Sequence, residues 1–253
     1  MSDPELYRVP AGLAARAHMD RGAYEAARIE ARERPEAFWA EKADRLDWIT
    51  RPTRIKDVSF DKADFRIRWF DDGVLNACFN CLDRHLPQRA DDRSILWEGD
   101  DPAQSGHLTY AELHREVCRM ANVLKGLDVN KGDRVTIYMP MIPAAAVAML
   151  ACARIGAVHS VVFGGFSPDS LAGRIEDCGS RIVITADEGL RGGKRVPLKA
   201  NVDAALEKVS VDHVLVVSHT NADIAWVEGR DVRYGEAKQG VGDDCPCEPM
   251  SAE

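Results

Sequence analysis

Three cations flank a double glycine in LRGGKR, residues 190–195, in a chain with a formal net charge of −8. The cations are Arg191, Lys194 and Arg195, and the glycines are Gly192 and Gly193. Positive charge gathered on glycine-rich backbone in an acidic protein is typical of a site that attracts an anion. An exposed cationic loop that only meets water is the alternative. The place of this stretch in the fold must decide between the two.

A second glycine pair, Gly164 and Gly165, follows an apolar segment and precedes Ser167-Pro168, which we predict to begin a helix. Without a Cβ atom, these residues let a ligand approach the backbone closely. The free amide groups at the start of the helix favour anions. A tight turn is the alternative reading of the same pair. The two glycine pairs together predict a binding site for a phosphorylated ligand.

The residues exclude several other chemistries. A Walker-type phosphate loop fails on spacing, because Gly189 and Gly193 are one residue too close and Arg195 stands where Ser or Thr should hold magnesium. His114 and His159 fit hydrogen-bonded structural roles better than catalytic ones. There is no G-x-S-x-G motif and no Ser-His-Asp or Cys-His arrangement. We therefore assign no catalytic residue.

Seven cysteines include one C-x-x-C pair, Cys78 and Cys81, and one C-P-C pair, Cys245 and Cys247. Four thiolates could hold zinc. However, Cys78 belongs to the apolar face of a predicted helix. The second pair is distant in the sequence, lies in a polar tail and has no histidine beside it. We therefore expect no metal site.

The composition bounds the partners and the compartment. The chain of 253 residues is 45% hydrophobic and 29% charged, as in soluble globular proteins. The acidic balance, with no basic stripe, argues against nucleic acid. The uncharged window 135–153 contains Pro140 and Pro143, so we expect a strand, a turn and a buried helix there, and no membrane span. The first ten residues lack the pattern of a secretory signal, and we expect a cytoplasmic protein.

From residue 109 onward the sequence alternates between β-branched strands and amphipathic helices. Thr109 and Glu112 form a capping box at the start of the first helix. This alternation predicts an α/β fold, a parallel βαβ sheet with helices on both faces. Both glycine pairs follow strands, so they open on the same edge of the sheet, where such folds bind ligands. We expect the last strand, 213–217, to lie near an edge. The predicted strands are 134–139, 157–162, 181–185 and 213–217, and the predicted helices are 109–126, 143–155, 167–179 and 197–209.

The first hundred residues are typical of an N-terminal cap. We predict a helix over 34–49, strands over 65–70 and 94–99, and a helix containing Cys78 whose apolar positions begin at Val74. Asp100 and Asp101 follow the second strand in a polar, turn-like stretch, where we expect solvated carboxylates.

Two long blocks resemble the AMP-forming acetyl-CoA synthetases of the adenylate-forming superfamily. They are WFDDGVLNACFNCLDRHL, residues 69–86, and VVFGGFSPDSLAGRIEDCGSRIVITADEGLRGGKRVPLKANVDAAL, residues 161–206. The resemblance extends over nearly the whole chain. It implies a ligase that forms acetyl-adenylate from acetate and ATP and then transfers the acetyl group to CoA. It also implies that the loop over residues 191–194 belongs to the CoA site, where it contacts the region of the 3′-phosphate, and that the pair Gly164-Gly165 lies near the same ligand. The matching residues are Arg191, Gly192, Gly193, Lys194, Gly164 and Gly165.

Lys194 departs from the family's pattern, where a second arginine is frequent; lysine keeps the charge but not the bidentate fork. The resemblance further implies a cap over residues 1–105 and the first part of the adenylation domain over 106–253. The phosphate loop, the ATP and magnesium sites and the C-terminal lid are expected outside the 253 residues. We therefore expect an N-terminal fragment that is inactive alone. The alternative is a truncated, non-catalytic module that binds CoA or another nucleotide.

Overall fold

The computed structural model of the protein describes residues 7–253; residues 1–6, part of the stretch that lacks a secretory signal pattern, lie outside it. The chain divides into two compact units. The smaller unit contains the residues up to Asp47, residues 51–73 and residues 252–253, and the larger contains residues 48–50 and 74–251. No helix in this described part of the chain is long and apolar enough to cross a membrane.

The smaller unit consists of short helices and one antiparallel hairpin. Asp20 begins its longest helix by accepting a hydrogen bond from the backbone N–H of Ala23 at 2.7 Å. The predicted strand over 65–70 is confirmed, whereas the predicted helix over 34–49 is shorter than expected and ends at Ala43. The elements are α1 (Ala11–Ala14), α2 (Arg21–Glu33), α3 (Pro35–Ala43), β1 (Lys56–Ser59) and β2 (Arg66–Trp69).

A five-stranded parallel sheet forms the centre of the larger unit, in the order β12-β11-β8-β6-β7. The expected α/β fold is confirmed. The apolar strands lie in the core of the unit, and β8 is buried along its whole length. The strands are β6 (Arg134–Tyr138), β7 (Val158–Val161), β8 (Ile182–Ala186), β11 (His213–Val217) and β12 (Asp231–Arg233).

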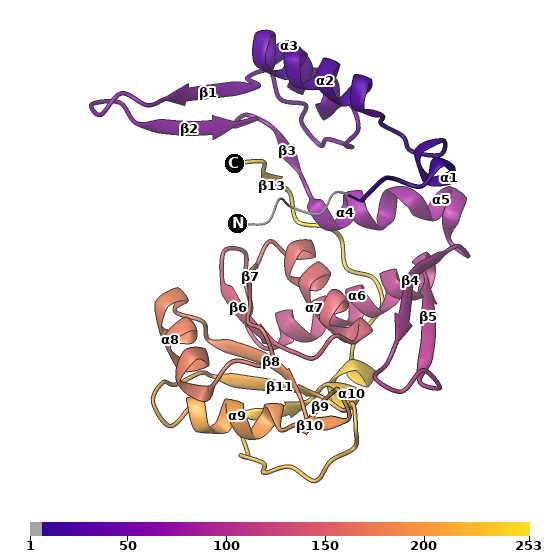
Figure 1. Ribbon diagram of the computed structural model, residues 1–253. Coiled ribbons are helices and arrows are strands. Elements are labelled where there is room, and N and C mark those ends of the chain that lie inside the picture. Colours follow the sequence, from indigo (N-terminus) through magenta and orange to yellow (C-terminus); the bar gives the residue numbers. More distant parts are fainter. Residues whose placement is uncertain (1–6) are drawn as a thin grey trace, which may run out of the picture. The chain divides into compact units, whose positions relative to one another are not determined.

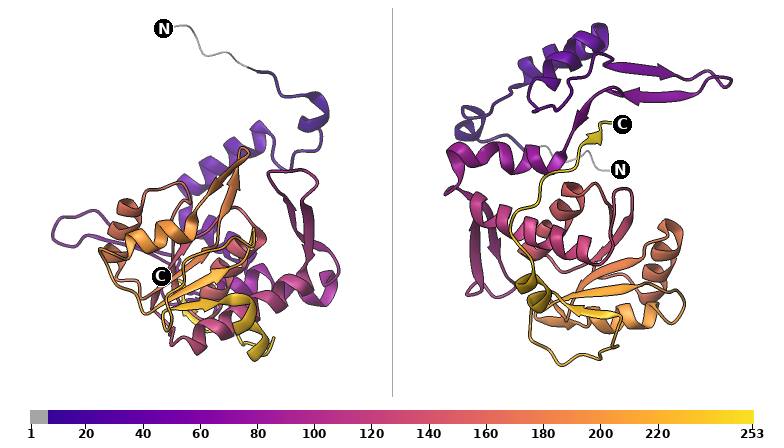
Figure 2. Two further views of the ribbon diagram at one scale, coloured as in Figure 1. Left: turned by 90° about the horizontal axis from the view of Figure 1, so that it is seen from below. Right: turned by 180° about the vertical axis from the view of Figure 1, so that it is seen from behind.

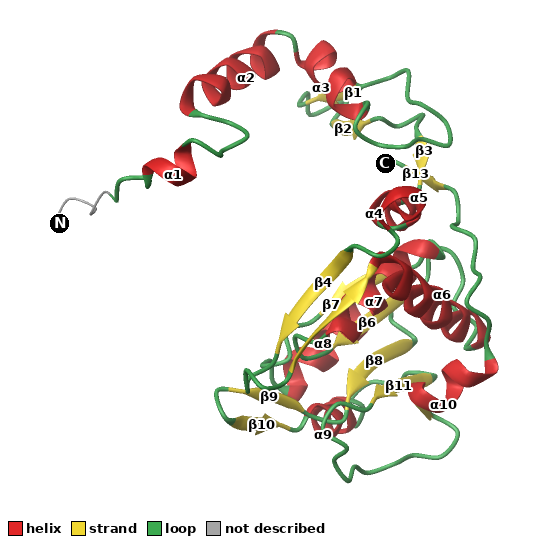
Figure 3. Cartoon of the chain, turned by 90° about the vertical axis from the view of Figure 1, so that its right-hand side faces the viewer, coloured by secondary structure: helices red, strands yellow, loops and turns green. Residues whose placement is uncertain are grey.

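Helices cover both faces of this sheet (Figures 1 and 3). The chain crosses from β6 to β7 on one side of β6 and then returns past β6 to β8 on its other side, so the two crossovers lie on opposite faces. The carboxyl ends of β6 and β8 therefore meet at a topological switch point, where α/β folds bind ligands. One face carries α6 (Tyr110–Gly126) and α7 (Pro143–Arg154), and the other carries α8 (Pro168–Cys178) and α9 (Leu198–Ala205).

Local signals in the sequence set the helix ends. The capping box is present: Thr109 accepts from the N–H of Glu112, whose side chain accepts from the N–H of Thr109. Ser167 caps α8, and Gly179 ends it with φ +60°. Helix α9 ends at Ala205, four residues before its predicted end.

Strand β11 lies next to the edge of the sheet, as expected from the sequence, but it is not the last strand. Strand β12, too short to be visible in the sequence, pairs in parallel with β11 and takes the edge position. Buried charges hold it there. The fully buried Lys199 ammonium lies 2.9 Å from Asp231 Oδ2, and the guanidinium of Arg230 lies 2.6 Å from Asp231 Oδ1. Burial opposes ionisation of Asp231, but its hydrogen bonds from Arg230 and Lys199 outweigh burial and lower its pKa.

The last part of the larger unit runs back along α6 to the start of the unit (Figure 2). Asn122 Nδ2 donates to the carbonyls of Gly242 and Asp244 at 2.9 Å each. Val74 and Leu75, predicted to be helical, instead form strand β3 because this returning segment supplies its antiparallel partner, β13. The remaining elements are β3 (Val74–Leu75), α4 (Ala77–Cys81), α5 (Leu86–Arg89), β4 (Arg93–Glu98), β5 (Ser105–Thr109), α10 (Tyr234–Ala237) and β13 (Met250–Ser251), with 3-10 turns at 83–85 and 238–240.

Candidate anion-binding site

The cationic stretch forms a β-hairpin that follows β8 directly (Figure 1). Strands β9 (Gly189–Arg191) and β10 (Lys194–Val196) pair antiparallel around a two-residue turn. Its central residues, Gly192 and Gly193, have φ of +57° and +73°. This left-handed pair is what a tight hairpin turn demands, and glycine adopts it without strain. The geometry of the turn therefore accounts for the double glycine.

Arg191 and Lys194 face each other directly across the hairpin. Side chains at facing positions of an antiparallel pair project from the same face of the ladder, and like charges there destabilise each other. Within residues 7–253, neither side chain forms an ion pair with a carboxylate, whereas Arg195 Nη1 lies 2.6 Å from Glu188 Oε2. Two unneutralised, facing cations favour the binding of an anion between them.

The Gly164-Gly165 segment meets this hairpin. A Cβ atom built on Gly165 would lie 3.4 Å from Arg191 Nη1 and 2.6 Å from the Phe163 ring. The Arg191 guanidinium itself lies 5.0 Å from the centre of that ring. A larger residue at position 165 would have to displace the Phe163 ring from its place beside Arg191. The structure thus brings Gly165, from one of the two sequence-predicted glycine pairs, next to Arg191 of the hairpin.

Tyr138, at the end of β6, holds the Gly164-Gly165 segment through hydrogen bonds to its backbone. Its buried hydroxyl donates to the carbonyl of Gly164 at 3.1 Å and to that of Phe166 at 2.9 Å, and Asn201 Nδ2 donates to it at 3.2 Å. Gly164 is also confined, because a Cβ atom there would lie 3.3 Å from the carbonyl oxygen of Met139. The segment is therefore held by the core of the sheet.

Asp187, which sequence reasoning missed, ties the hairpin to the next loop. Its carboxylate, only 3% exposed, accepts backbone hydrogen bonds from His219 at 2.9 Å and from Thr220 and Ala222 at 3.2 Å. Burial opposes its charge, but these bonds and that from Glu188 lower its pKa. An aspartate at the end of a buried strand was the only signal in the sequence. It positions the hairpin and is not free to meet a ligand.

Asp100 is exposed to solvent, as expected, but water is not the only partner of this side chain. Its carboxylate accepts hydrogen bonds from the amides of Gly192 and Gly193, at 2.9 and 2.6 Å. The loop between β4 and β5 carries Asp100 to the hairpin turn across 92 residues of sequence. Nothing local in the sequence could have indicated this contact.

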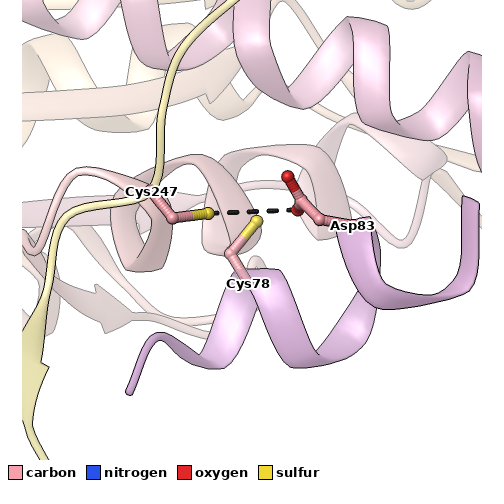
Figure 4. Close-up of side chains that lie close together, drawn as sticks. All are labelled: Cys78, Asp83 and Cys247. Carbon is pink, nitrogen blue, oxygen red and sulfur yellow. Dashed lines mark hydrogen bonds between the residues drawn. The ribbon is translucent and has the colours of Figure 1, made fainter. Parts of the chain in front are cut away.

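A different cluster forms where the two cysteine pairs meet (Figure 4). Cys78 of α4 and Cys247 of the returning segment lie beside Asp83, with their ligand atoms within 4.8 Å of one another. Cys81 is exposed and takes no part. The second cysteine pair is thus distant in sequence but close in space, because β13 pairs with β3.

An ion pair already occupies this cluster. Arg154, 3% exposed, donates to both oxygens of Asp83 at 2.8 and 2.9 Å. Its Nη1 also lies 3.5 Å from Cys78 Sγ, and its Nε donates to the carbonyl of Cys245. A buried cation in this position opposes a second, metallic cation. The cluster fits a link between α4, α7 and the returning segment better than a metal centre.

His114 completes this arrangement and has the structural role expected of it. Its Nε2 lies 3.2 Å from Asp83 Oδ1, and this hydrogen bond raises the pKa of His114 to about 9, although Arg154 Nη2 lies 3.3 Å from the same nitrogen. Burial opposes the charge of Asp83, but the bonds from His114 and Arg154 hold its pKa well below the usual range.

We expect the 253-residue protein to bind no stoichiometric zinc. Zinc would have to separate Asp83 from Arg154 and leave a buried guanidinium unpaired. The measurement is metal content after equilibration with excess zinc and gel filtration, with the Cys247→Ser variant as the control. One zinc per chain in the wild type, lost in Cys247→Ser, would show that the ion pair yields to a metal.

Comparisons with known proteins cover the chain in two parts. A family model described as "AMP-binding enzyme" matches residues 82–250, and one described as "Acetyl-coenzyme A synthetase N-terminus" matches residues 24–81.

Similar curated proteins carry the name acetyl-coenzyme A synthetase. That of Caulobacter vibrioides is 61% identical over 254 residues, which is all of this chain and 39% of the relative. That of Bradyrhizobium sp. (strain ORS 278) is 60% identical over 98% of this chain and 38% of the relative. That of Methylorubrum extorquens (strain PA1) is 59% identical over 87% of this chain and 34% of the relative. The chain therefore spans less than half the length of these relatives.

Proposed function

Because the chain belongs to the AMP-binding enzyme family, we propose that it acts as the N-terminal part of an acetate–CoA ligase. In the complete protein, acetate attacks the α-phosphate of ATP to give acetyl-adenylate and pyrophosphate. The CoA thiol then attacks the acetyl carbonyl and releases AMP. The names of the relatives, acetyl-coenzyme A synthetase, support this assignment.

The hairpin and the glycine segment would hold the phosphorylated end of CoA. The observation that carries this assignment is the facing pair of Arg191 and Lys194, two cations without a carboxylate partner among residues 7–253, next to Gly165. Gly164 and Gly165 allow close backbone approach, and Gly192 and Gly193 form the turn between the cations. A 3′-phosphate would give the side chains of Arg191 and Lys194 a negatively charged partner.

The remaining assignments are part of the same proposal. Residues 1–105 form a cap and residues 106–253 the first part of the adenylation domain. No catalytic residue is assigned within the chain, and the ATP phosphates and magnesium would bind residues outside it. Nucleic acid and membranes are not partners in this proposal, and the complete protein would work in the cytoplasm. A CoA- or nucleotide-binding module without catalysis is the second candidate, which the length of the match to the relatives keeps open.

The isolated 253-residue protein should catalyse no acetate-dependent ATP–pyrophosphate exchange. The side chains of residues 7–253 offer cations for the phosphorylated end of CoA, but they offer no catalytic group for the adenylation step. That step depends on preorganised groups that stabilise the developing charge. The measurement is isotope exchange between pyrophosphate and ATP, with and without acetate. The complete synthetase that contains these residues is the positive control.

The outcomes separate the candidates. Exchange by the complete protein alone supports the ligase. A complete protein that binds CoA without exchange or acetyl transfer supports the binding module. Exchange above background by the pure 253-residue protein would show that the nucleotide site lies inside this chain.

A further inference from the structure

The turn of the β9–β10 hairpin is already bound to an internal anion. Asp100 Oδ1 accepts from the amide of Gly192 at 2.9 Å, and Asp100 Oδ2 accepts from that of Gly193 at 2.6 Å. Successive amides in a turn of this kind form a concave site for anions. The carboxylate fills that site, so an incoming phosphate would meet the side chains of the hairpin and not its turn amides.

The two hydrogen bonds of Asp100 join the connection between β4 and β5 to the turn between β9 and β10. Asp100 lies in the connection from β4 to β5, which is closed by hydrogen bonds from Gly99 N to Gln104 O at 2.7 Å and from Gln104 N to Asp101 O at 2.8 Å. The amides of Gly193 and Gly192 lower the pKa of Asp100, so its carboxylate stays charged at neutral pH. The tether is thus a charge-assisted, two-point contact.

The hairpin needs such a tether. Strands β9 and β10 pair over three residues each and over a turn of two glycines. A two-stranded hairpin is marginal in water even when longer, and glycine adds conformational freedom to its turn. The facing charges of Arg191 and Lys194 weaken it further. By binding both turn amides, Asp100 counteracts all three effects.

We propose that Asp100 is a positioning residue for the CoA site: it holds the hairpin turn so that Arg191 and Lys194 are presented together to the phosphate. The proposal rests on the proposed function. In it, Asp100 touches neither substrate nor reacting atoms and acts only through the amides of Gly192 and Gly193.

The test uses Asp100→Ala in the complete synthetase, with Asp101→Ala as the matched control. Asp101 is the next residue and accepts from the amide of Ala103 at 3.0 Å, within its own loop. We expect Asp100→Ala, which removes the exposed contact with the turn amides, to raise the KM for CoA about fivefold. The kcat at saturating CoA and the ATP–pyrophosphate exchange should not change. Asp100→Asn keeps an amide oxygen as acceptor and should raise this KM about twofold.

Hydrogen exchange of the peptide that covers residues 190–195 gives a second readout in the 253-residue protein. Exchange there should accelerate in Asp100→Ala and stay at the wild-type rate in Asp101→Ala, because only the former frees the amides of Gly192 and Gly193. Unchanged exchange in Asp100→Ala would overturn the tether itself.

Comparison with Arg191→Ala separates this inference from the proposed function. If Arg191→Ala raises the KM for CoA and Asp100→Ala does not, the positioning role is wrong and the CoA site stands. If neither variant affects that KM, the CoA assignment fails and the inference falls with it. A lower KM for CoA in both Asp100→Ala and Asp100→Asn would also overturn it, because the carboxylate would then repel the ligand and not position its site.

Discussion

Replacing Arg191 with alanine in the complete synthetase should raise the KM for CoA by roughly 10- to 150-fold. One charge-assisted hydrogen bond to a phosphate is worth about 1.5–3 kcal/mol, which corresponds to this range. Adenylate formation precedes CoA binding in the proposed reaction, so acetate-dependent ATP–pyrophosphate exchange should change little. Measuring both half-reactions on the same preparation checks the prediction.

Dephospho-CoA, which lacks the 3′-phosphate, sharpens this experiment. The wild type should prefer CoA over dephospho-CoA, and Arg191→Ala should lose most of that preference. Lys194→Ala should act in the same direction but more weakly, because an ammonium is a less directional partner than a guanidinium. Arg195→Ala is the control within the same hairpin, since this side chain pairs with Glu188.

Two results would not support the CoA assignment. Equal loss in both half-reactions of Arg191→Ala would indicate a folding defect. No loss in either would mean that the hairpin is an exposed surface without a ligand.

Replacing Asp83 with alanine should lower the free energy of unfolding of the 253-residue protein by about 3 kcal/mol. The change leaves the guanidinium of Arg154 buried without its carboxylate, and breaking a buried pair from one side costs about 3–5 kcal/mol. The lower end applies because the Asp83 side chain remains 18% exposed. Urea unfolding followed by circular dichroism measures the difference.

Asp92→Ala is the matched control, because it removes an exposed ion pair with Arg89 whose side chains are 57% and 47% exposed. It should destabilise the protein far less than Asp83→Ala, because solvent screens an exposed ion pair. The double variant Asp83→Ala/Arg154→Leu should regain part of the loss, since no unpaired charge stays buried. Similar small losses in Asp83→Ala and Asp92→Ala would mean that water reaches Arg154 and that the cluster does not hold the returning segment.

The sequence by itself determined the features that depend on neighbours within a few residues. Examples are the capping box of Thr109 and Glu112 and the glycine that ends α8, because both depend on residues within one helical turn. The alternation of apolar strands and amphipathic helices determined the parallel sheet. Because the carboxyl ends of parallel strands lie at one edge of a sheet, the same alternation placed Gly165 and Arg191 at that edge.

Tertiary structure alone decided which distant groups meet. Asp100 reaches the hairpin turn from 92 residues away, and Cys247 reaches Asp83 from 164 residues away. Strand β12 has three residues, too few for a periodic pattern, and exists because β11 offers it an open edge. Such contacts depend on which residues the loops bring together in the folded chain, and loop closure leaves no periodic pattern in the residues that it joins. The sequence therefore identified the two cations that face each other across the hairpin, whereas only the fold showed which carboxylate contacts the turn between them.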